Sequence, residues 1–233
     1  MAEKTVSIEA PILDRNDRIA AGLRKRFSES GTYVVNVLSS PGSGKTSLIL
    51  ATAEHLRDRY RIAVIEGDIA SDVDARAMKE AGLPAVQINT GGLCHLEGNM
   101  ISQAVDALDA GVGLDAIDVI FIENVGNLVC PVDFDLGENL AVMVLSIPEG
   151  DDKPVKYPGI FQHAGAQILN KVDVAPAFDF NRAAYERSLD ELAPAAPRFA
   201  VSARTGEGMD AWCSWLEADI DRALSGARRG ERQ

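Results

Sequence analysis

Short apolar runs alternate with amphipathic stretches along most of the chain. Residues 34–38 (VVNVL) are rich in β-branched side chains and predict a buried strand, and residues 46–60 carry apolar side chains at helical spacing. Strands alternating with helices predict an α/β fold with a doubly wound, mostly parallel seven-stranded sheet. The six further strands are predicted at residues 61–66, 85–89, 118–122, 141–147, 166–169 and 199–202.

Amphipathic segments fill the intervals between these strands. A leading N-terminal helix is predicted from about residue 14, with Gly31 as its stop, and it should pack outside the sheet. We expect one domain over residues 1–233, with residues 1–30 as a helical extension and a frayed tail at 227–233. The other helices are predicted at residues 74–82, 101–110, 154–164, 179–193 and 208–225.

Composition limits the class of protein. Apolar residues make up 46% of the 233 residues and charged residues 25%, which is ordinary for a soluble globular protein. No apolar run reaches about eighteen residues and no apolar leader follows Met1, so we expect a cytoplasmic protein without a membrane span. The net charge of −12 argues against nucleic acid or an anionic membrane as partner.

A glycine-rich segment joins the first predicted strand to its helix. Residues 40–46 read Ser-Pro-Gly-Ser-Gly-Lys-Thr, and this turn would direct several backbone N–H groups at a polyphosphate. In a P-loop, Lys45 would reach the β- and γ-phosphates and the Thr46 hydroxyl would ligate Mg²⁺, although Ser39 replaces the usual opening glycine. The predicted nucleotide-binding residues here are Pro41, Gly42, Ser43, Gly44, Lys45, Thr46 and Ser47.

An acidic residue follows the second predicted strand. Asp68 lies just past residues 61–66, at the edge where α/β sheets bind ligands. We predict that it ligates Mg²⁺ directly or through water. The alternative is a solvated turn in which Ser71 or Asp72 caps the next helix, and we favour the capping role for Ser71.

Two segments after the sixth and seventh strands predict recognition of guanine. The carboxylate of Asp173, in Asn170-Lys171-Val172-Asp173, would accept hydrogen bonds from the guanine N1–H and amino group. Lys171 would pack its stem over the base. The segment Ser202-Ala203-Arg204 resembles the SAK segment whose backbone supports the guanine oxygen. With the P-loop, these motifs in this order predict a GTPase.

Residues 123–126, Glu-Asn-Val-Gly, match the DxxG switch of GTPases with Glu in place of Asp. The acid would lie near Mg²⁺ and the Gly126 N–H would meet the γ-phosphate, so this segment should move on hydrolysis. No glutamine stands where many GTPases position the attacking water, and intrinsic hydrolysis should therefore be slow. The predicted catalytic residues are Lys45, Asp68, Glu123 and Gly126.

Two of the three cysteines, with one histidine, form a candidate metal site. Cys94 and His95 are adjacent, and Cys130 lies just beyond the predicted switch. Two thiolates and an imidazole suit Ni²⁺ or Zn²⁺, whereas Mg²⁺ prefers oxygen. Adjacent residues can share one metal only on a loop or helix start, which Gly91-Gly92 would supply. Three ligands leave tetrahedral coordination incomplete, so water or a second chain across a two-fold axis must complete it.

Other arrangements of these residues remain open at this point. The two cysteines could be unrelated buried thiols and His95 a surface residue. Cys213 lies in a helical pattern between Trp212 and Trp215, so we predict that it belongs to the core.

The segments SSPGSGKT, EGD, GGLCHLEG, ENVGNLVCP, NKVD and SAR together resemble the HypB family of hydrogenase nickel-incorporation GTPases, over about residues 10–225. The resemblance implies a homodimeric SIMIBI-class P-loop GTPase that binds GTP or GDP with Mg²⁺ and delivers Ni²⁺ to a [NiFe]-hydrogenase large-subunit precursor. It also implies a metal site of Cys94, His95 and Cys130 at the dimer interface, which Zn²⁺ can also occupy, and a nickel-donating partner of the HypA type. Because the chain lacks an N-terminal Cys-rich motif and a His-rich tract, no separate N-terminal nickel site is expected.

Three alternatives compete with this interpretation. The urease nickel GTPase is similar in fold, but its metal motif is Cys-Pro-His, whereas here Val132 follows Cys130-Pro131. ATPases of the same class carry a signature lysine where this chain has Ser40. The third alternative is a structural zinc protein with a vestigial nucleotide fold, which closed tetrahedral zinc without GTP turnover would support.

Overall fold

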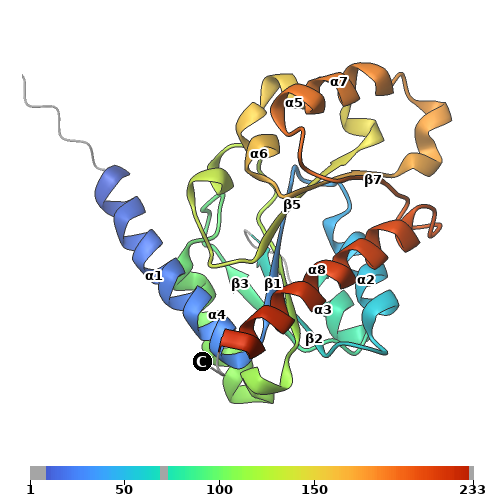
Figure 1. Ribbon diagram of the computed structural model, residues 1–233. Coiled ribbons are helices and arrows are strands. Elements are labelled where there is room, and N and C mark those ends of the chain that lie inside the picture. The colour runs from blue at the N-terminus through green and yellow to red at the C-terminus, as the bar shows by residue number, and fades with distance from the viewer. Residues whose placement is uncertain (1–8, 69–72, 231–233) are drawn as a thin grey trace, which may run out of the picture.

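The computed structural model describes residues 9–68 and 73–230, and these form a seven-stranded sheet covered by helices on both faces (Figure 1). The strand order is β3-β2-β4-β1-β5-β6-β7, and all six pairings are parallel. The predicted doubly wound fold is confirmed. The strands are β1 (Tyr33–Ser39), β2 (Ile62–Asp68), β3 (Ala85–Asn89), β4 (Val119–Glu123), β5 (Leu140–Ser146), β6 (Ala166–Asn170) and β7 (Arg198–Ala200).

Helices cover both faces of the sheet. One face packs against α2 (Lys45–Leu56), α3 (Val73–Glu80) and α8 (Met209–Gly230). The other face packs against α1 (Glu9–Ser30) and α4 (Gly98–Val112) over one half, and against α6 (Pro158–His163) and α7 (Arg182–Leu192) over the other. The short helix α5 (Lys153–Lys156) contacts α6 and α7.

The last helix, α8, ends at Gly230. The expected fraying of residues 227–233 stays a prediction. Residues 231–233, and residues 1–8 of the predicted extension, lie outside the described part of the chain.

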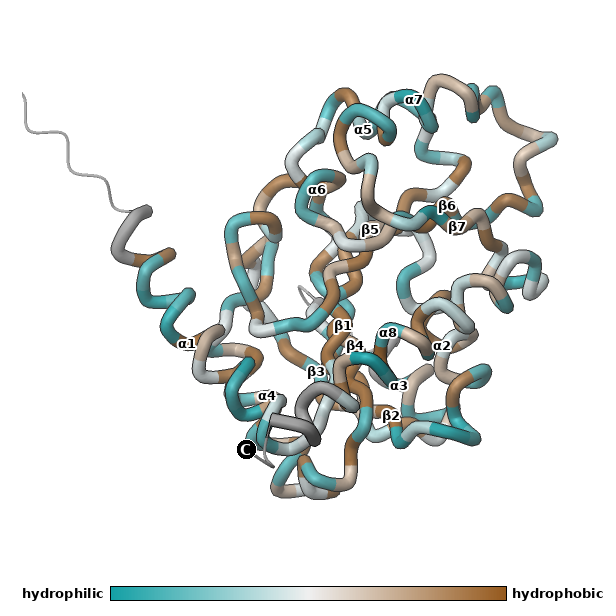
Figure 2. Tube along the Cα trace, in the orientation of Figure 1, coloured by the Kyte–Doolittle hydropathy of each residue, from teal (hydrophilic) through white to brown (hydrophobic). Residues whose placement is uncertain are grey.

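The central strands are largely apolar on both faces, as buried parallel strands usually are. In β1, Val35 and Val37 pack toward α2 and α8, whereas Val34 packs toward α1 and α4. Figure 2 shows hydrophobic residues concentrated in the central strands. Cys213 is buried in the same core, as its helical pattern predicts. Because all strands run parallel, the loops after their carboxyl ends gather along one edge of the sheet.

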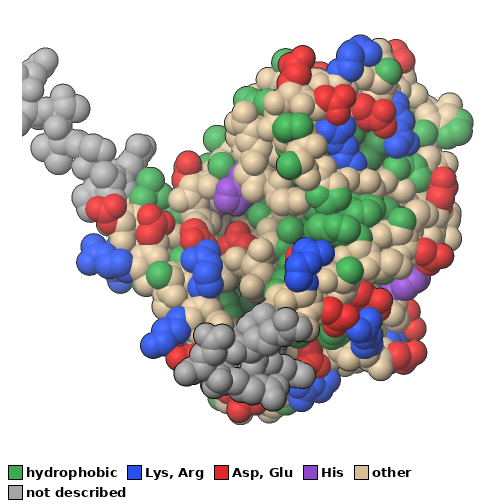
Figure 3. Space-filling model, in the orientation of Figure 1, with side chains coloured by type: hydrophobic (Ala, Val, Ile, Leu, Met, Phe, Trp, Pro, Cys, Tyr) green, Lys and Arg blue, Asp and Glu red, His purple; other side chains and the backbone are tan. Residues whose placement is uncertain are grey.

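The surface carries charges of both signs. On the face shown in Figure 3, acidic and basic side chains are interspersed. The sum of the formal charges over the whole sequence is −12. Among the described helices, none combines the length and the hydropathy that crossing a membrane requires.

Candidate nucleotide and metal site

The loop between β1 and α2 has a backbone that depends on its glycines. Gly42 and Gly44 have φ angles of 76° and 94°, in the left-handed region. A Cβ on Gly44 would lie 2.6 Å from Nδ2 of Asn170 and would collide with it. Lys45 is 8% exposed, and its ammonium donates to Oγ of Ser39 over 2.9 Å. The serine that replaces the usual P-loop glycine therefore gives the loop lysine an acceptor.

Oxygen ligands suited to Mg²⁺ meet beside this loop. Thr46 Oγ1 donates to Oε1 of Glu123 over 2.8 Å, and Glu123 is buried at the end of β4. Its in-register neighbour on β2 is Glu66, which is also buried. Glu66 belongs to the EGD segment quoted above, but sequence reasoning assigned it no role, because one acid inside a buried strand does not reveal which residue lies beside it. A hydroxyl and a carboxylate in contact are the donor types that Mg²⁺ takes.

Asp68 occupies a different place from the one predicted. It is the last residue of β2 and does not follow the strand, because the pairing of β2 with β3 continues through Asp68 and Asn89. The side chain of Asp68, with Ser71 and Asp72, lies outside the described residues. The predicted metal and capping roles therefore stay predictions.

The predicted switch packs directly on the P-loop. A Cβ on Gly126 would lie 2.7 Å from the backbone nitrogen of Pro41, so only glycine allows this approach. The predicted switch is also bonded to β1, because Asn124 Nδ2 donates to Oδ1 of Asn36 over 3.2 Å. Asn36 in turn donates to Glu138 over 2.9 Å. A buried amide thus joins the switch to the segment that follows Cys130.

The NKVD and SAR segments line a pocket of ≈ 530 Å³ next to the P-loop. The carboxylate of Asp173 accepts hydrogen bonds from Ser202 Oγ over 2.7 Å and from the guanidinium of Arg204. The Ser202 bond, with the Arg204 bond and charge, lowers the pKa of Asp173, so this side chain is an ionised acceptor at neutral pH. The pocket is lined by Gly44, Ser47, Leu50, Ala51, Asn170, Lys171, Asp173, Val174, Ser202, Ala203 and Arg204.

Two residues of NKVD fasten this pocket to the P-loop. Asn170 donates from Nδ2 to the Ser43 carbonyl over 3.0 Å and accepts from the Ala203 N–H over 3.2 Å. Lys171 has a φ of 60°, and its ammonium donates to the Gly42 carbonyl over 2.6 Å. The structure therefore brings all three predicted nucleotide-binding segments into one site.

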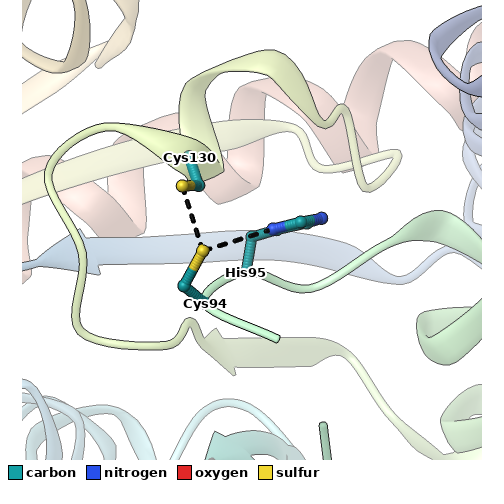
Figure 4. A group of neighbouring side chains, drawn as sticks. All are labelled: Cys94, His95 and Cys130. Carbon is teal, nitrogen blue, oxygen red and sulfur yellow. Dashed lines mark hydrogen bonds between the residues drawn. The ribbon is translucent and has the colours of Figure 1, made fainter. Parts of the chain in front are cut away.

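The cysteines and the histidine meet at the same edge (Figure 4). Cys94 and His95 lie in the loop between β3 and α4, and Cys130 begins a 3₁₀ turn, Cys130–Asp133. The two Sγ atoms are 3.0 Å apart, and His95 Nδ1 lies 3.8 Å from Cys94 Sγ. A tetrahedral ion with metal–sulfur bonds of about 2.3 Å separates its sulfurs by roughly 3.8 Å, so a small outward movement of the thiols admits one.

The surroundings of His95 orient its ring. The imidazole stacks on Phe134 with centroids 3.9 Å apart, and Nε2 lies 3.5 Å from Oε1 of Glu97. The ring therefore directs Nδ1 toward the thiols. The hydrogen bond with Cys94 raises the pKa of the Cys130 thiol in the absence of metal. Sequence reasoning did not single out Phe134, whose only signal is its place four residues after Cys130.

Together, the parallel sheet, the P-loop and the adjoining thiol–imidazole cluster define a P-loop nucleotide-binding protein with a candidate metal centre next to its switch. The family model "CobW/HypB/UreG, nucleotide-binding domain" matches residues 33–200. The chain belongs to the HypB family of hydrogenase maturation factors. It is 47% identical over 230 residues to hydrogenase maturation factor HypB of Rhizobium leguminosarum bv. viciae, covering 99% of this chain and 74% of that protein.

Two comparisons with HypB proteins of Helicobacter pylori agree with membership of the HypB family. The hydrogenase/urease maturation factor HypB of strain 26695 is 39% identical over 218 residues, covering 93% of this chain and 88% of the relative. The crystal structure of HypB from Helicobacter pylori in complex with nickel superposes with a TM-score of 0.86 at 38% identity. That match covers 90% of this chain and 97% of the crystallised one.

Proposed function

We propose that this chain is a GTP-hydrolysing nickel metallochaperone that works as a homodimer. The observation that carries the proposal is the position of Cys130, seven residues after Glu123. Glu123 accepts a hydrogen bond from Thr46 of the P-loop. One short segment thus holds both a phosphate-sensing switch and a metal ligand. The cargo is Ni²⁺, received from an accessory protein of the HypA type and inserted into the [NiFe]-hydrogenase large-subunit precursor.

The nucleotide half of the proposal assigns one task to each residue. Lys45 supplies a fixed positive charge to the β- and γ-phosphates, and Asp173 accepts from the N1–H and amino group of guanine. Thr46 and Glu123 hold Mg²⁺, which when bound neutralises phosphate charge. The backbone of Gly126, already against the P-loop, reads the γ-phosphate. Without a glutamine to orient water, hydrolysis is slow and serves as a timer.

The metal half rests on the chemistry of the donor set. Cys94, His95 and Cys130 offer two sulfurs and one nitrogen within 4.8 Å of one another, which suits Ni²⁺ and also admits Zn²⁺. The structural relative from Helicobacter pylori was crystallised with nickel. Water or a second copy of the chain supplies the remaining coordination. Leu93 and Val129 are 42% and 58% exposed beside the two cysteines, and an apolar rim of this kind supports a contact between copies.

The proposal is tested on the purified chain in two assays. We expect GTP to be hydrolysed with a clear preference over ATP, and Ni²⁺ to bind through thiolates, giving charge-transfer absorption. Cys94→Ala should weaken that absorption, because only the Cys130 thiolate remains, and should weaken Ni²⁺ binding by at least about tenfold while leaving GTP turnover within about twofold. Cys213→Ala, the buried cysteine outside the cluster, is the matched control. Tightly held zinc with no GTP turnover would instead support the structural zinc protein.

The name of one relative points to a second enzyme that could receive nickel. The Helicobacter pylori protein at 39% identity is named a hydrogenase/urease maturation factor. Urease is therefore the second candidate recipient of nickel. Incubating the nickel-loaded chain and GTP with each apo-enzyme separately, and measuring nickel incorporated, decides between the two recipients.

A further inference from the structure

The metal ligands come from two separate segments, between which the chain passes through α4 and β4. Cys94 and His95 precede α4, and Cys130 opens the segment that leads to Asp135. Helix α1 contacts both segments through one side chain, Asn16, which is 5% exposed. Asn16 Oδ1 accepts from the N–H of Gly98 over 2.7 Å, and Asn16 Nδ2 donates to the carbonyl of Asp135 over 2.8 Å.

Helix α1 packs closely against both segments. A Cβ on Gly98 would lie 3.2 Å from Oδ1 of Asn16, and one on Gly137 would lie 2.9 Å from the Ala20 carbonyl. Arg24, two turns along α1, pairs with the Asp135 carboxylate over 2.8 Å. The helix is therefore seated on both metal-bearing segments rather than on one of them.

We propose that Asn16 is a positioning residue for the metal cluster, holding the Cys94-His95 loop and the Cys130 segment in register. The inference rests on the proposed metal site and adds a function for α1. A primary amide carries both a donor and an acceptor, so one buried side chain satisfies a backbone N–H on one segment and a carbonyl on the other. Without it, both backbone groups lose a buried partner and the two segments can separate.

Asn16→Ala tests the proposal through metal binding. We expect Ni²⁺ affinity to fall by about tenfold to a hundredfold, the range seen when outer-shell partners of metal ligands are removed. The thiolate-to-nickel absorption should weaken or shift, whereas affinity for a GTP analogue should stay within about twofold. The matched control is Phe27→Leu, a buried change near the other end of α1 that loosens the packing of this helix but leaves both Asn16 hydrogen bonds in place.

Asn16→Asp separates bridging from simple capping of α4. The carboxylate keeps an acceptor for the Gly98 N–H and suits a helix N-terminus, but it cannot donate to the Asp135 carbonyl. Bridging predicts that Asn16→Asp loses nickel affinity as Asn16→Ala does. If Asn16→Asp binds nickel like the parent, Asn16 is only a cap and the proposal is wrong.

Two other results would also overturn it. One is unchanged nickel affinity in Asn16→Ala. The other is an equal loss in Phe27→Leu at matched thermal stability, which would show a general effect of loosening α1. A parent chain that binds no nickel at all would contradict the proposed metal site itself, so the two failures are distinguishable.

Discussion

In Lys45→Ala, GTP turnover is expected to fall by at least about a hundredfold, the scale of loss when one fixed electrostatic contact to a developing charge is removed. The Lys45 ammonium is buried in the loop and donates to Ser39, so its positive charge has a fixed position beside the backbone that would bind the phosphates. Phosphate release under single-turnover conditions measures the effect. Lys156→Ala, an exposed lysine paired with Asp152, controls for the loss of one positive charge.

The outcome bears on the P-loop assignment alone. Turnover in Lys45→Ala at the parental rate, with correct folding by circular dichroism, would mean that the phosphates bind elsewhere. Loss of turnover in Lys156→Ala to the same extent would trace the effect to overall charge.

Asp173→Asn should move the preference from guanosine to xanthosine triphosphate by at least about a hundredfold in relative affinity, because sites built on hydrogen bonds reject mismatched partners strongly. The ionised carboxylate accepts two N–H donors from guanine, whereas an amide can donate to the xanthine carbonyl. Competition between the two triphosphates for a fluorescent analogue gives the ratio directly.

The control for Asp173→Asn is a variant that breaks another aspartate–arginine pair, away from the pocket. Asp190 pairs with Arg198 over 2.7 Å, as Asp173 pairs with Arg204, so Asp190→Asn also breaks an aspartate–arginine pair. Its base preference should stay with guanosine. If Asp173→Asn binds GTP as tightly as the parent does, Asp173 is not the base reader.

The succession of strands and helices along the chain, and the motifs at the strand ends, could be predicted because both are local. The run VVNVL and the helical spacing after Thr46 fix a strand and a helix around the P-loop, and the same logic holds for Asn170-Lys171-Val172-Asp173 after β6. Parallel strands then place their carboxyl ends together, so the meeting of these segments followed from the fold class.

Contacts between distant segments could not be predicted in this way. Asn16 bonds Gly98 and Asp135 across 82 and 119 residues, and nothing in a polar position on an amphipathic helix marks it as a bridge. Glu66 looks like an interruption of an apolar run until its register with Glu123 is known. The stacking of Phe134 on His95 depends on the path of the 3₁₀ turn, which has no periodic signature.

The central claim is that the nucleotide state changes the affinity of the metal site through the segment between Gly126 and Cys130. Linkage makes the coupling reciprocal, so nickel must change affinity for the GTP analogue by the same factor. In Cys130→Ala, the GTP analogue should bind almost as in the parent, and nickel should no longer alter that affinity. The apolar pair Leu128 and Val129 lies between the two sites and would weaken the coupling if it absorbed the movement of the switch.

The direct measurement is a titration of Ni²⁺ into the parent chain, once with GDP and Mg²⁺ and once with a non-hydrolysable GTP analogue and Mg²⁺, with the oligomeric state followed in the same samples. The account predicts nickel affinities that differ between the two states by about 5-fold to 150-fold, the usual range of allosteric coupling, and more dimer with the analogue. Identical nickel affinities in both nucleotide states would leave a metal site that the switch does not control, and would contradict the proposed mechanism of delivery.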